Sequence, residues 1–136
     1  MRFVFIDEAG TSEHEPVTVV VGVIVDADRQ MTLAEAAANE VLNGVPSQFK
    51  DGFQFHAEEV FGNSKKYGPL WSIADRVYFL QKMMEIPRKL VLGLSFAIAR
   101  RDAVDDISKH CPPGLYPYQF QHVIAFQDCI ARADKF

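Results

Sequence analysis

The sequence predicts an α/β fold, in which strands and helices occur along one chain. Three runs of β-prone apolar residues, at 2–7, 17–25 and 89–99, are separated by segments with helical periodicity. Of the 136 residues, 49% are hydrophobic and 12% are aromatic, which is enough to form the core of one domain over 1–136. A short polar loop between the first two runs favours an antiparallel hairpin.

The first run delivers two carboxylates into a turn. Phe3 to Ile6 are apolar without alternation, which is typical of a strand covered on both faces. Asp7 and Glu8 follow at the strand end, and Gly10 breaks the strand. Adjacent carboxylates repel each other unless a cation or hydrogen bonds compensate, so the pair indicates a divalent metal. The alternative is that both are solvated turn residues.

The next segments are expected to pack rather than to carry chemistry. Residues 17–25 predict the most regular strand. Asp26 or Asp28 is expected to cap a helix that runs to about Asn43, and Gly44 is placed to end it. The apolar positions of this alanine-rich helix recur every four residues, so we predict a packing role.

A second chemically dense stretch follows Phe53 to Phe55, whose alternation predicts a short strand before a helical turn. It contains His56, Glu58 and Glu59. Histidine is the commonest neutral metal ligand and proton carrier near pH 7, so an imidazole beside carboxylates indicates a site. The alternative is a structural histidine followed by the solvated first turn of a helix, where the helix dipole favours acidic residues.

A basic loop and a helix come next. Lys65 and Lys66 can contact phosphate, although a lysine pair is typical of ordinary surface. Helical spacing from 70 to 85 predicts a helix that Pro87 ends. The stripe expected to be buried is Ile73, Val77, Leu80 and Met84.

The strand at 89–99 is expected at the centre of the sheet, because its residues are almost all apolar. Arg100, Arg101 and Asp102 follow it. Strand ends face the ligand crevice in α/β sheets, so Asp102 is a reserve metal ligand and the arginines are reserve phosphate contacts. The alternative, an exposed turn, is the reading that the sequence favours.

A last helix is predicted from about Tyr118. Asp128 and Asp134 lie on it, and the pattern favours the solvated side for both. The face expected to be buried is Phe120, Val123, Phe126, Ile130 and Ala133.

Composition excludes several classes of protein. The net charge of -4 and the pI near 5.5 exclude a sequence-wide basic field for nucleic-acid binding, so any such contact must be local. Cys111 and Cys129 form no Cys-x-x-Cys motif and are expected to be reduced thiols. No signal segment or apolar run of roughly 18 residues is present, so we expect a cytoplasmic protein with no membrane partner.

Two blocks resemble a known family. The stretch from Phe5 to Gly10 is similar to the Phe-Ile-Asp-Glu-Ser-Gly signature of domain-of-unknown-function family 3800, a bacterial and phage family grouped with ribonuclease H-like folds. The stretch from Phe55 to Phe61 is similar to its second block, and Asp7 and Glu8 match the family's acidic pair. The resemblance implies a ribonuclease H-like mixed sheet with an N-terminal hairpin and flanking helices, and a metal-dependent nuclease or related phosphoryl-transfer activity.

One departure from the family pattern concerns the C-terminal part. The family's Gln-x-x-Asp motif, on a helix after a further strand, has no match, because Gln127 and Asp128 are adjacent. The pattern up to Phe136 favours a domain that lacks its last strand and helix, and the alternative is a natural short version with an incomplete site. We therefore expect an unfilled sheet position or an exposed apolar groove, which a second copy of the chain can cover.

The expected function is hydrolysis of a DNA or RNA phosphodiester by Mg²⁺ or Mn²⁺ held between carboxylates. Asp7 is the expected central ligand, and Glu8 is a ligand or orienting group. Glu58 or Glu59 is the second carboxylate, and His56 is a proton carrier or phosphate contact. Successive strand side chains alternate, so only one of the adjacent pair can face this site without a bend. The rival hypothesis is a non-catalytic ribonuclease H-like binding or assembly module.

Overall fold

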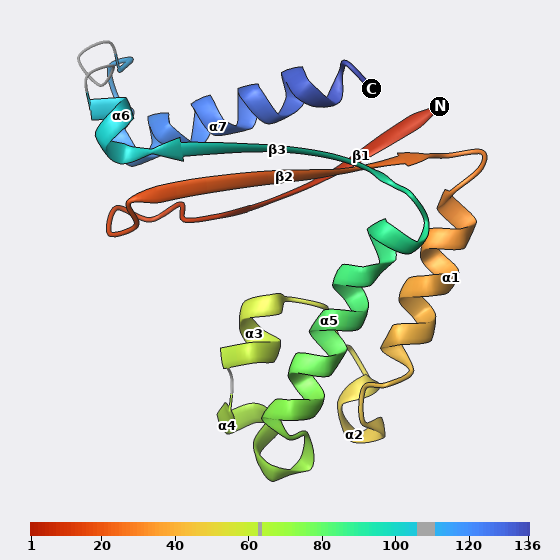
Figure 1. Ribbon diagram of the computed structural model, residues 1–136. Helices are drawn as coiled ribbons and strands as arrows, with labels where there is room; N and C mark the ends of the chain where they lie inside the picture. The colour runs from red at the N-terminus through yellow and green to blue at the C-terminus, as the bar shows by residue number, and fades with distance from the viewer. Residues whose placement is uncertain (63, 106–110) are drawn as a thin grey trace. The chain divides into compact units, whose positions relative to one another are not determined.

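The computed structural model describes residues 1–62, 64–105 and 111–136, and the chain forms two compact units. One unit, called here the sheet unit, comprises Met1–Ala27 and Leu92–Phe136. The other, called the helical unit, comprises Asp28–Val91. Figure 1 labels the elements of both. Strands and helices occur together, as an α/β fold requires, and the single domain over 1–136 stays a prediction.

Three antiparallel strands form the sheet, in the order β1 (Arg2–Ala9), β2 (Val17–Asp26) and β3 (Gly93–Arg100). The predicted hairpin is confirmed, and so is the third strand in the same sheet. The expectation that this third strand is central is wrong, because β3 lies at an edge of the sheet and β2 is the middle strand. The residues of β3 alternate between a buried face and an exposed face, so its apolar character does not reflect a central position. Gly10 begins the hairpin turn with φ at 77°, where an added Cβ would collide with the carbonyl of Val17. Both strand pairs are antiparallel, so the described residues contain no parallel pair of the kind a mixed sheet requires.

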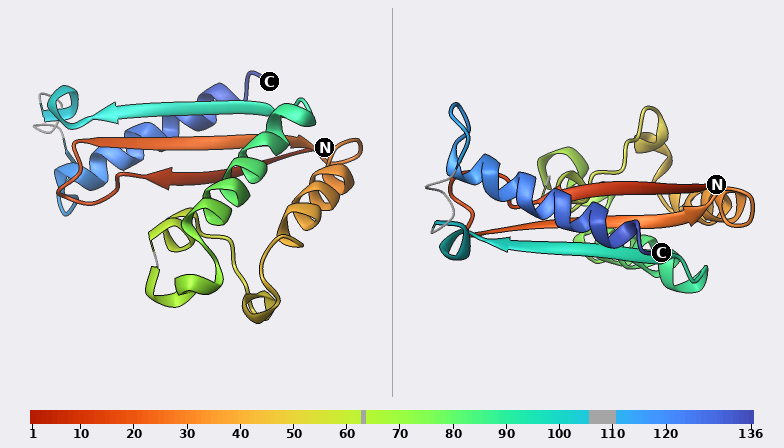
Figure 2. Two further views of the ribbon diagram at one scale, coloured as in Figure 1. Left: turned by 60° about the horizontal axis from the view of Figure 1, so that its bottom comes forward. Right: turned by 90° about the horizontal axis from the view of Figure 1, so that it is seen from above.

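Helix α7 (Pro117–Ala133) covers one face of the sheet, over β2 and β3 (Figure 2). Small side chains permit this close approach: Ala97 and Ala99 on the sheet and Ala125 on the helix are buried. Gly22 lies in the same layer, where an added Cβ would meet Ser95 Oγ at 2.7 Å. The core of the sheet unit therefore depends on residues that are small enough to let a helix and a sheet meet.

The predicted buried face of α7 is right at Phe120, which packs against the core of the sheet unit, and wrong at Val123, Phe126 and Ile130. Its buried residues are Gln121, Ala125 and Cys129, whereas Val123 and Ile130 are exposed. Gln121 is tolerated in the interior because its Nε2 donates to the Ala99 carbonyl oxygen at 2.7 Å. The helix carries two apolar stripes, and the one that includes this amide faces the sheet.

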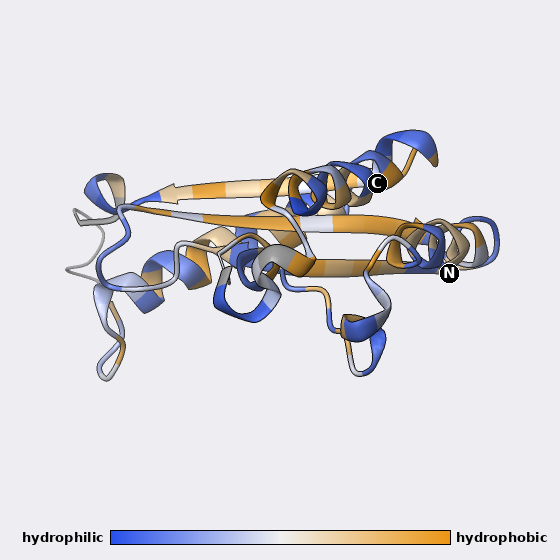
Figure 3. Cartoon of the chain, turned by 90° about the horizontal axis from the view of Figure 1, so that it is seen from below, coloured by the Kyte–Doolittle hydropathy of each residue, from blue (hydrophilic) through white to orange (hydrophobic). Residues whose placement is uncertain are grey.

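The strands are largely hydrophobic along their length (Figure 3), and many of the large apolar side chains on the face opposite α7 are exposed. The exposed large side chains of this face are Phe3, Phe5, Val21, Leu94, Phe96 and Ile98. The expectation that the first strand is covered on both faces is wrong, because α7 packs over β2 and β3 and leaves most of β1 exposed. Large apolar side chains thus lie outside the core of this unit.

The helical unit is built around an aromatic cluster. Its elements are α1 (Met31–Leu42), α2 (Ser47–Lys50), α3 (Ala57–Gly62), α4 (Ser64–Tyr67), η1 (Gly68–Leu70) and α5 (Ile73–Lys89). Tyr67, Trp71 and Phe79 are buried, with ring centroids 5.1 Å apart between the first two and 5.3 Å apart between the last two. Their nearly perpendicular rings favour edge-to-face contact, which stabilises such clusters.

Several element boundaries in this unit differ from the prediction. Residues 53–55 form no strand, because their phenylalanines turn into the aromatic cluster instead of pairing with a neighbouring strand. Helix α1 begins after Gln30 without a side-chain cap, since β2 extends through Asp26. Pro87 lies inside α5 rather than at its end, where it removes only one backbone donor from the last turn.

The extension of α5 to Lys89 also moves the start of β3 to Gly93. Ser72 caps α5 by accepting a hydrogen bond from the Asp75 amide at 3.1 Å. Two residues of the predicted buried stripe, Ile73 and Met84, are exposed, and the buried residues are Arg76, Phe79 and Ile86. The helix therefore buries a neighbouring face that contains an arginine.

Candidate functional site

Asp7 lies within β1 and not at its end, because the strand continues to Ala9. In the sheet register it lies opposite Val21, which in turn lies opposite Phe96. Directly opposed residues share a face, so the carboxylate of Asp7 belongs to the exposed apolar face. A charged residue at the end of an otherwise apolar row offers nothing to packing, and its exposure leaves it accessible to a ligand.

Glu8 points to the other face, toward α7. Its Oε1 lies 4.0 Å from Nε2 of His122, and both side chains are partly exposed. Asp7 and Glu8 thus diverge, as the alternation of strand side chains predicts. The expected bend at Ala9 that would turn Glu8 back is absent from this hairpin, since Ala9 is itself paired with Val19. The two carboxylates therefore cannot hold one ion together on either face of the sheet.

His122 is a neighbour that the sequence did not reveal. It lies on α7 next to the buried Gln121, and its ring packs edge-on against Phe126 with centroids 6.4 Å apart. When protonated, His122 attracts the Glu8 carboxylate. No motif links a residue near the end of the chain to one in the first strand, so only the packing of α7 on the sheet brings them together.

The second acidic stretch lies at the start of α3. His56 immediately precedes the helix, and its carbonyl oxygen accepts a hydrogen bond from the Val60 amide at 2.9 Å. Glu58 and Glu59 occupy the first turn, which is a favourable place for negative charge. Glu59 pairs with Lys66, and this hydrogen bond raises the pKa of the lysine. Among the predicted ligands of this stretch, Glu58 is exposed and Glu59 is already engaged.

A buried arginine holds α3 against α5. Arg76 is 2% exposed, and its Nη1 donates to the carbonyl oxygens of Val60 at 2.9 Å and Phe61 at 3.2 Å. These carbonyls lie near the C-terminal end of α3, where a cation is favourable. The guanidinium also lies 5.8 Å from the ring centroid of Tyr67. Arg76 is therefore a positioning residue for the helix that carries Glu58 and Glu59, and its place inside an otherwise apolar stripe hid it from sequence analysis.

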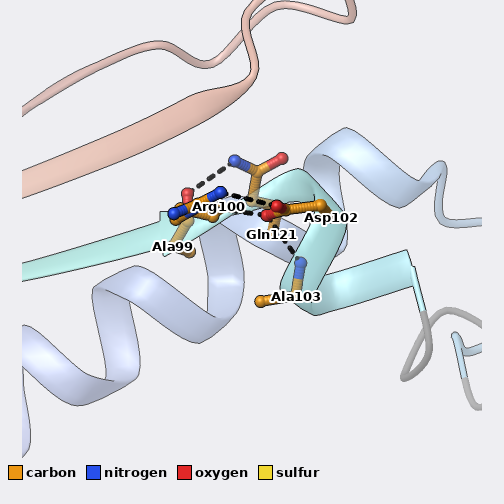
Figure 4. Close-up of polar contacts among 5 residues, drawn as sticks. All are labelled: Ala99, Arg100, Asp102, Ala103 and Gln121. Atoms are coloured by element: carbon orange, nitrogen blue, oxygen red, sulfur yellow. Dashed lines mark hydrogen bonds and ion pairs between the residues drawn. The ribbon is translucent and has the colours of Figure 1, made fainter.

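The reserve ligand Asp102 is occupied by its neighbour Arg100 (Figure 4). The guanidinium binds both carboxylate oxygens, with Nε to Oδ1 at 3.1 Å and Nη2 to Oδ2 at 2.6 Å. Oδ1 also accepts from the Ala103 amide at 2.9 Å. The hydrogen bonds from Arg100 lower the pKa of Asp102. The pair lies at the exposed start of α6 (Arg101–Asp105), and each of its two charges is compensated by the other.

Arg101 joins the end of β3 to the hairpin turn. Its guanidinium donates to the carbonyl oxygens of Ser12 and Glu13. The two arginines at this strand end are therefore both hydrogen-bonded within the sheet unit, and the role of reserve phosphate contacts stays a prediction.

The structure brings together only part of the predicted site. In the residues that the structure describes, no group of three or more His, Cys, Asp and Glu side chains gathers to hold a metal ion. Asp7 belongs to the sheet unit and His56, Glu58 and Glu59 belong to the helical unit, so their convergence stays a prediction.

No family model, curated protein or solved structure matches this chain. Across the described ranges, no helix is both long enough and apolar enough to cross a membrane.

Proposed function

We propose that this chain belongs to the ribonuclease H-like family that its two blocks resemble, and that Asp7 is the central ligand of a site for metal-dependent phosphodiester hydrolysis. The observation that supports the proposal best is the position of Asp7. It is an exposed carboxylate on a sheet face that is otherwise apolar, where it contributes nothing to the core. A residue that is unfavourable in its local structure, such as an aspartate in an apolar strand, is expected mainly where a functional site requires it.

The remaining ligands follow from what each side chain already contacts. A Mg²⁺ or Mn²⁺ site needs more than one carboxylate, and among the paired residues of β1 and β2 Asp7 is the carboxylate on this face. Glu58, which is exposed in the first turn of α3, stays the second carboxylate that the sequence predicts. Glu59 must leave Lys66 before it can bind a metal, and Glu8 acts in support from the opposite face with His122. His56 is the proton carrier at the start of α3.

The bound ion would activate water and neutralise the charge that develops on the phosphate. The chain's own contribution is to hold these ligands on stable elements. Asp7 is fixed by its place in a paired strand, and α3 is fixed by the hydrogen bonds from Arg76. Nucleic acid, DNA or RNA, is the proposed substrate class.

Substitution of Asp7 tests the site directly. Asp7→Asn removes the charge and almost no volume, so we expect it to abolish Mn²⁺-dependent cleavage of labelled single- and double-stranded DNA and RNA oligonucleotides. It should also abolish Mn²⁺ binding in calorimetry while the circular dichroism spectrum is unchanged. Asp128→Asn is the matched control, because Asp128 is an exposed aspartate of the same unit that pairs with Arg132. Cleavage at the unaltered rate in Asp7→Asn would refute the metal site.

A second function has its own supporting observation. Asp7 and Glu8 point to opposite faces, and the sheet exposes large apolar side chains, which favours a non-catalytic binding or assembly module. Calorimetric measurement of metal binding by the unaltered chain distinguishes the two functions. An unaltered chain that binds neither Mn²⁺ nor Mg²⁺ and still self-associates would support the module over the enzyme.

A further inference from the structure

The free edge of β1 is the starting point. In the strand order β1-β2-β3, β1 is terminal, and within the residues described no strand pairs with its second edge. Natural proteins protect edge strands with charged side chains, proline, bulges, or a covering helix or loop. The middle of β1 has none of these, because Phe3, Val4 and Phe5 are apolar and 43%, 40% and 53% exposed. The backbone of β1 can therefore pair with a further strand at its open edge.

The charges of β1 are separated along its length. Arg2 is the first residue of the strand, and Asp7 and Glu8 lie in its C-terminal half. Antiparallel pairing of this strand with an identical strand brings each positive end beside a negative end. We propose that two copies of the chain associate through antiparallel pairing of their β1 strands, with Arg2 of one copy opposite Glu8 of the other. The occupant of the free edge is thus a second copy of this chain.

This register is consistent with the faces of the sheet. Directly opposed residues of antiparallel strands point to the same face, and even-numbered β1 residues point toward α7. Arg2 and Glu8 are both even, so their side chains meet on the α7 side. In the same register Phe5 lies opposite Phe5 of the second copy, on the two-fold axis. One strand provides both halves of the contact, as an isologous dimer requires.

The charges next to Arg2 favour the same pairing. On its inner side Arg2 lies opposite Asp26 of β2, so the second copy would place the cation between two carboxylates. Shifting the register by two residues in one direction moves Arg2 opposite Ile6, and a shift in the other direction moves it past the strand end. Among the registers that keep both α7 helices on one side of the joined sheet, the proposed one is the register that pairs Arg2 with a carboxylate.

Apolar surface beside the edge extends the contact beyond the strand. Phe126 of α7 is 39% exposed and packs against His122, which lies next to Glu8 of β1. A two-fold axis perpendicular to the sheet keeps both α7 helices on one side, so this apolar surface of each copy faces the other across the new strand pair. Backbone pairing and side-chain burial therefore act together. Asp7 stays on the opposite face, and the inference does not rest on the proposed function.

Cysteine cross-linking tests the register. At the two-fold axis, opposed Cα atoms lie about 4.5 to 5.5 Å apart, which a disulfide can bridge. In a Cys111→Ser background with Cys129 buried, we expect Phe5→Cys to give a covalent dimer under mild oxidation. Phe3→Cys is the matched control on the same face, because its two copies would be offset by about 13 Å along the strands. Equal cross-linking of the two variants would overturn the register.

Charge exchange tests the pairing in solution by sedimentation equilibrium. Arg2→Glu and Glu8→Arg each place like charges opposite one another at two symmetric positions, so we expect each to weaken dimerisation about tenfold. The double variant Arg2→Glu/Glu8→Arg restores opposite charges and should recover the affinity. Arg100→Glu on β3 is the control reversal at the far edge of the sheet. An unaltered chain that is monomeric at every concentration, or a double variant as weak as the singles, would overturn the proposal.

Discussion

The sheet unit and the helical unit place their large apolar side chains in opposite ways. In the helical unit Tyr67, Trp71 and Phe79 fill the interior. In the sheet unit the buried core is made of smaller residues, and the phenylalanines of β1 and β3 are exposed. The helical unit is thus stabilised by aromatic burial, and the sheet unit by the close approach of a helix and a sheet. The comparison indicates that the sheet unit keeps its large apolar groups available for contacts with other molecules.

Deleting one large aromatic side chain from each unit should give the largest contrast. Trp71→Ala should lower the stability of the helical unit by about 3–5 kcal/mol, because it empties the centre of the aromatic cluster. Phe96→Ala, at an exposed position of β3, should cost less than about 1 kcal/mol. Hydrogen exchange resolved along the chain measures each unit separately. Equal losses of protection would show that Phe96 is part of a core and would remove the contrast.

Adding a methyl group should have a smaller effect, and it should destabilise the sheet unit rather than the helical unit. Gly22→Ala places a Cβ 2.7 Å from Ser95 Oγ and 3.1 Å from Val4 Cγ1, so we expect the sheet unit to lose about 1–3 kcal/mol. Gly62→Ala in the helical unit meets no atom within 4 Å and should cause no loss. Urea unfolding followed by circular dichroism compares the two variants. A Gly22→Ala protein as stable as the parent would show that the α7 side of the sheet is not closely packed.

The smallest expected effect concerns the ion pair at the end of β3. The folded pKa of Asp102 is lowered by Arg100, so the pair's contribution to stability is present at neutral pH. That contribution is lost as the pH falls from the ordinary aspartate pKa through the lowered value. Carboxyl-carbon NMR should show that Arg100→Gln raises the titration midpoint of Asp102, whereas Arg132→Gln leaves it in place. An unchanged midpoint in Arg100→Gln would contradict the assignment of the shift to this pair.

The strands could be predicted because their signal is local. Val17 to Asp26 is rich in β-branched residues and the run before Arg100 is largely apolar, and a strand forms in each, although the second begins at Gly93. The buried faces of the helices could not be predicted in this way. In α7 the choice between two apolar stripes depends on whether Gln121 finds the Ala99 carbonyl, which is a tertiary contact.

In the candidate site too, features set by local sequence could be predicted and features set by tertiary contacts could not. The divergence of Asp7 and Glu8 follows from strand alternation and could be predicted from their adjacency. The contact between Glu8 and His122 could not, because it depends on how α7 crosses the sheet. Arg76 was missed for a related reason. A charged residue on a helix is expected in water, and only the carbonyls of α3 make its burial favourable.

The composition of β1 has a consequence for its tolerance of insertion and deletion. The strand has four successive apolar residues followed by two successive carboxylates. If β1 slipped by one residue against β2, each face would therefore still carry two of these apolar side chains and one carboxylate. The strand therefore carries little information about its own alignment. That information resides in β2, where Gly22 leaves room for Val4 and the buried residues alternate with partly exposed ones through most of the strand. Loss of one residue within Phe3 to Ile6 would exchange the places of Asp7 and Glu8 and still present one carboxylate to each side of the sheet.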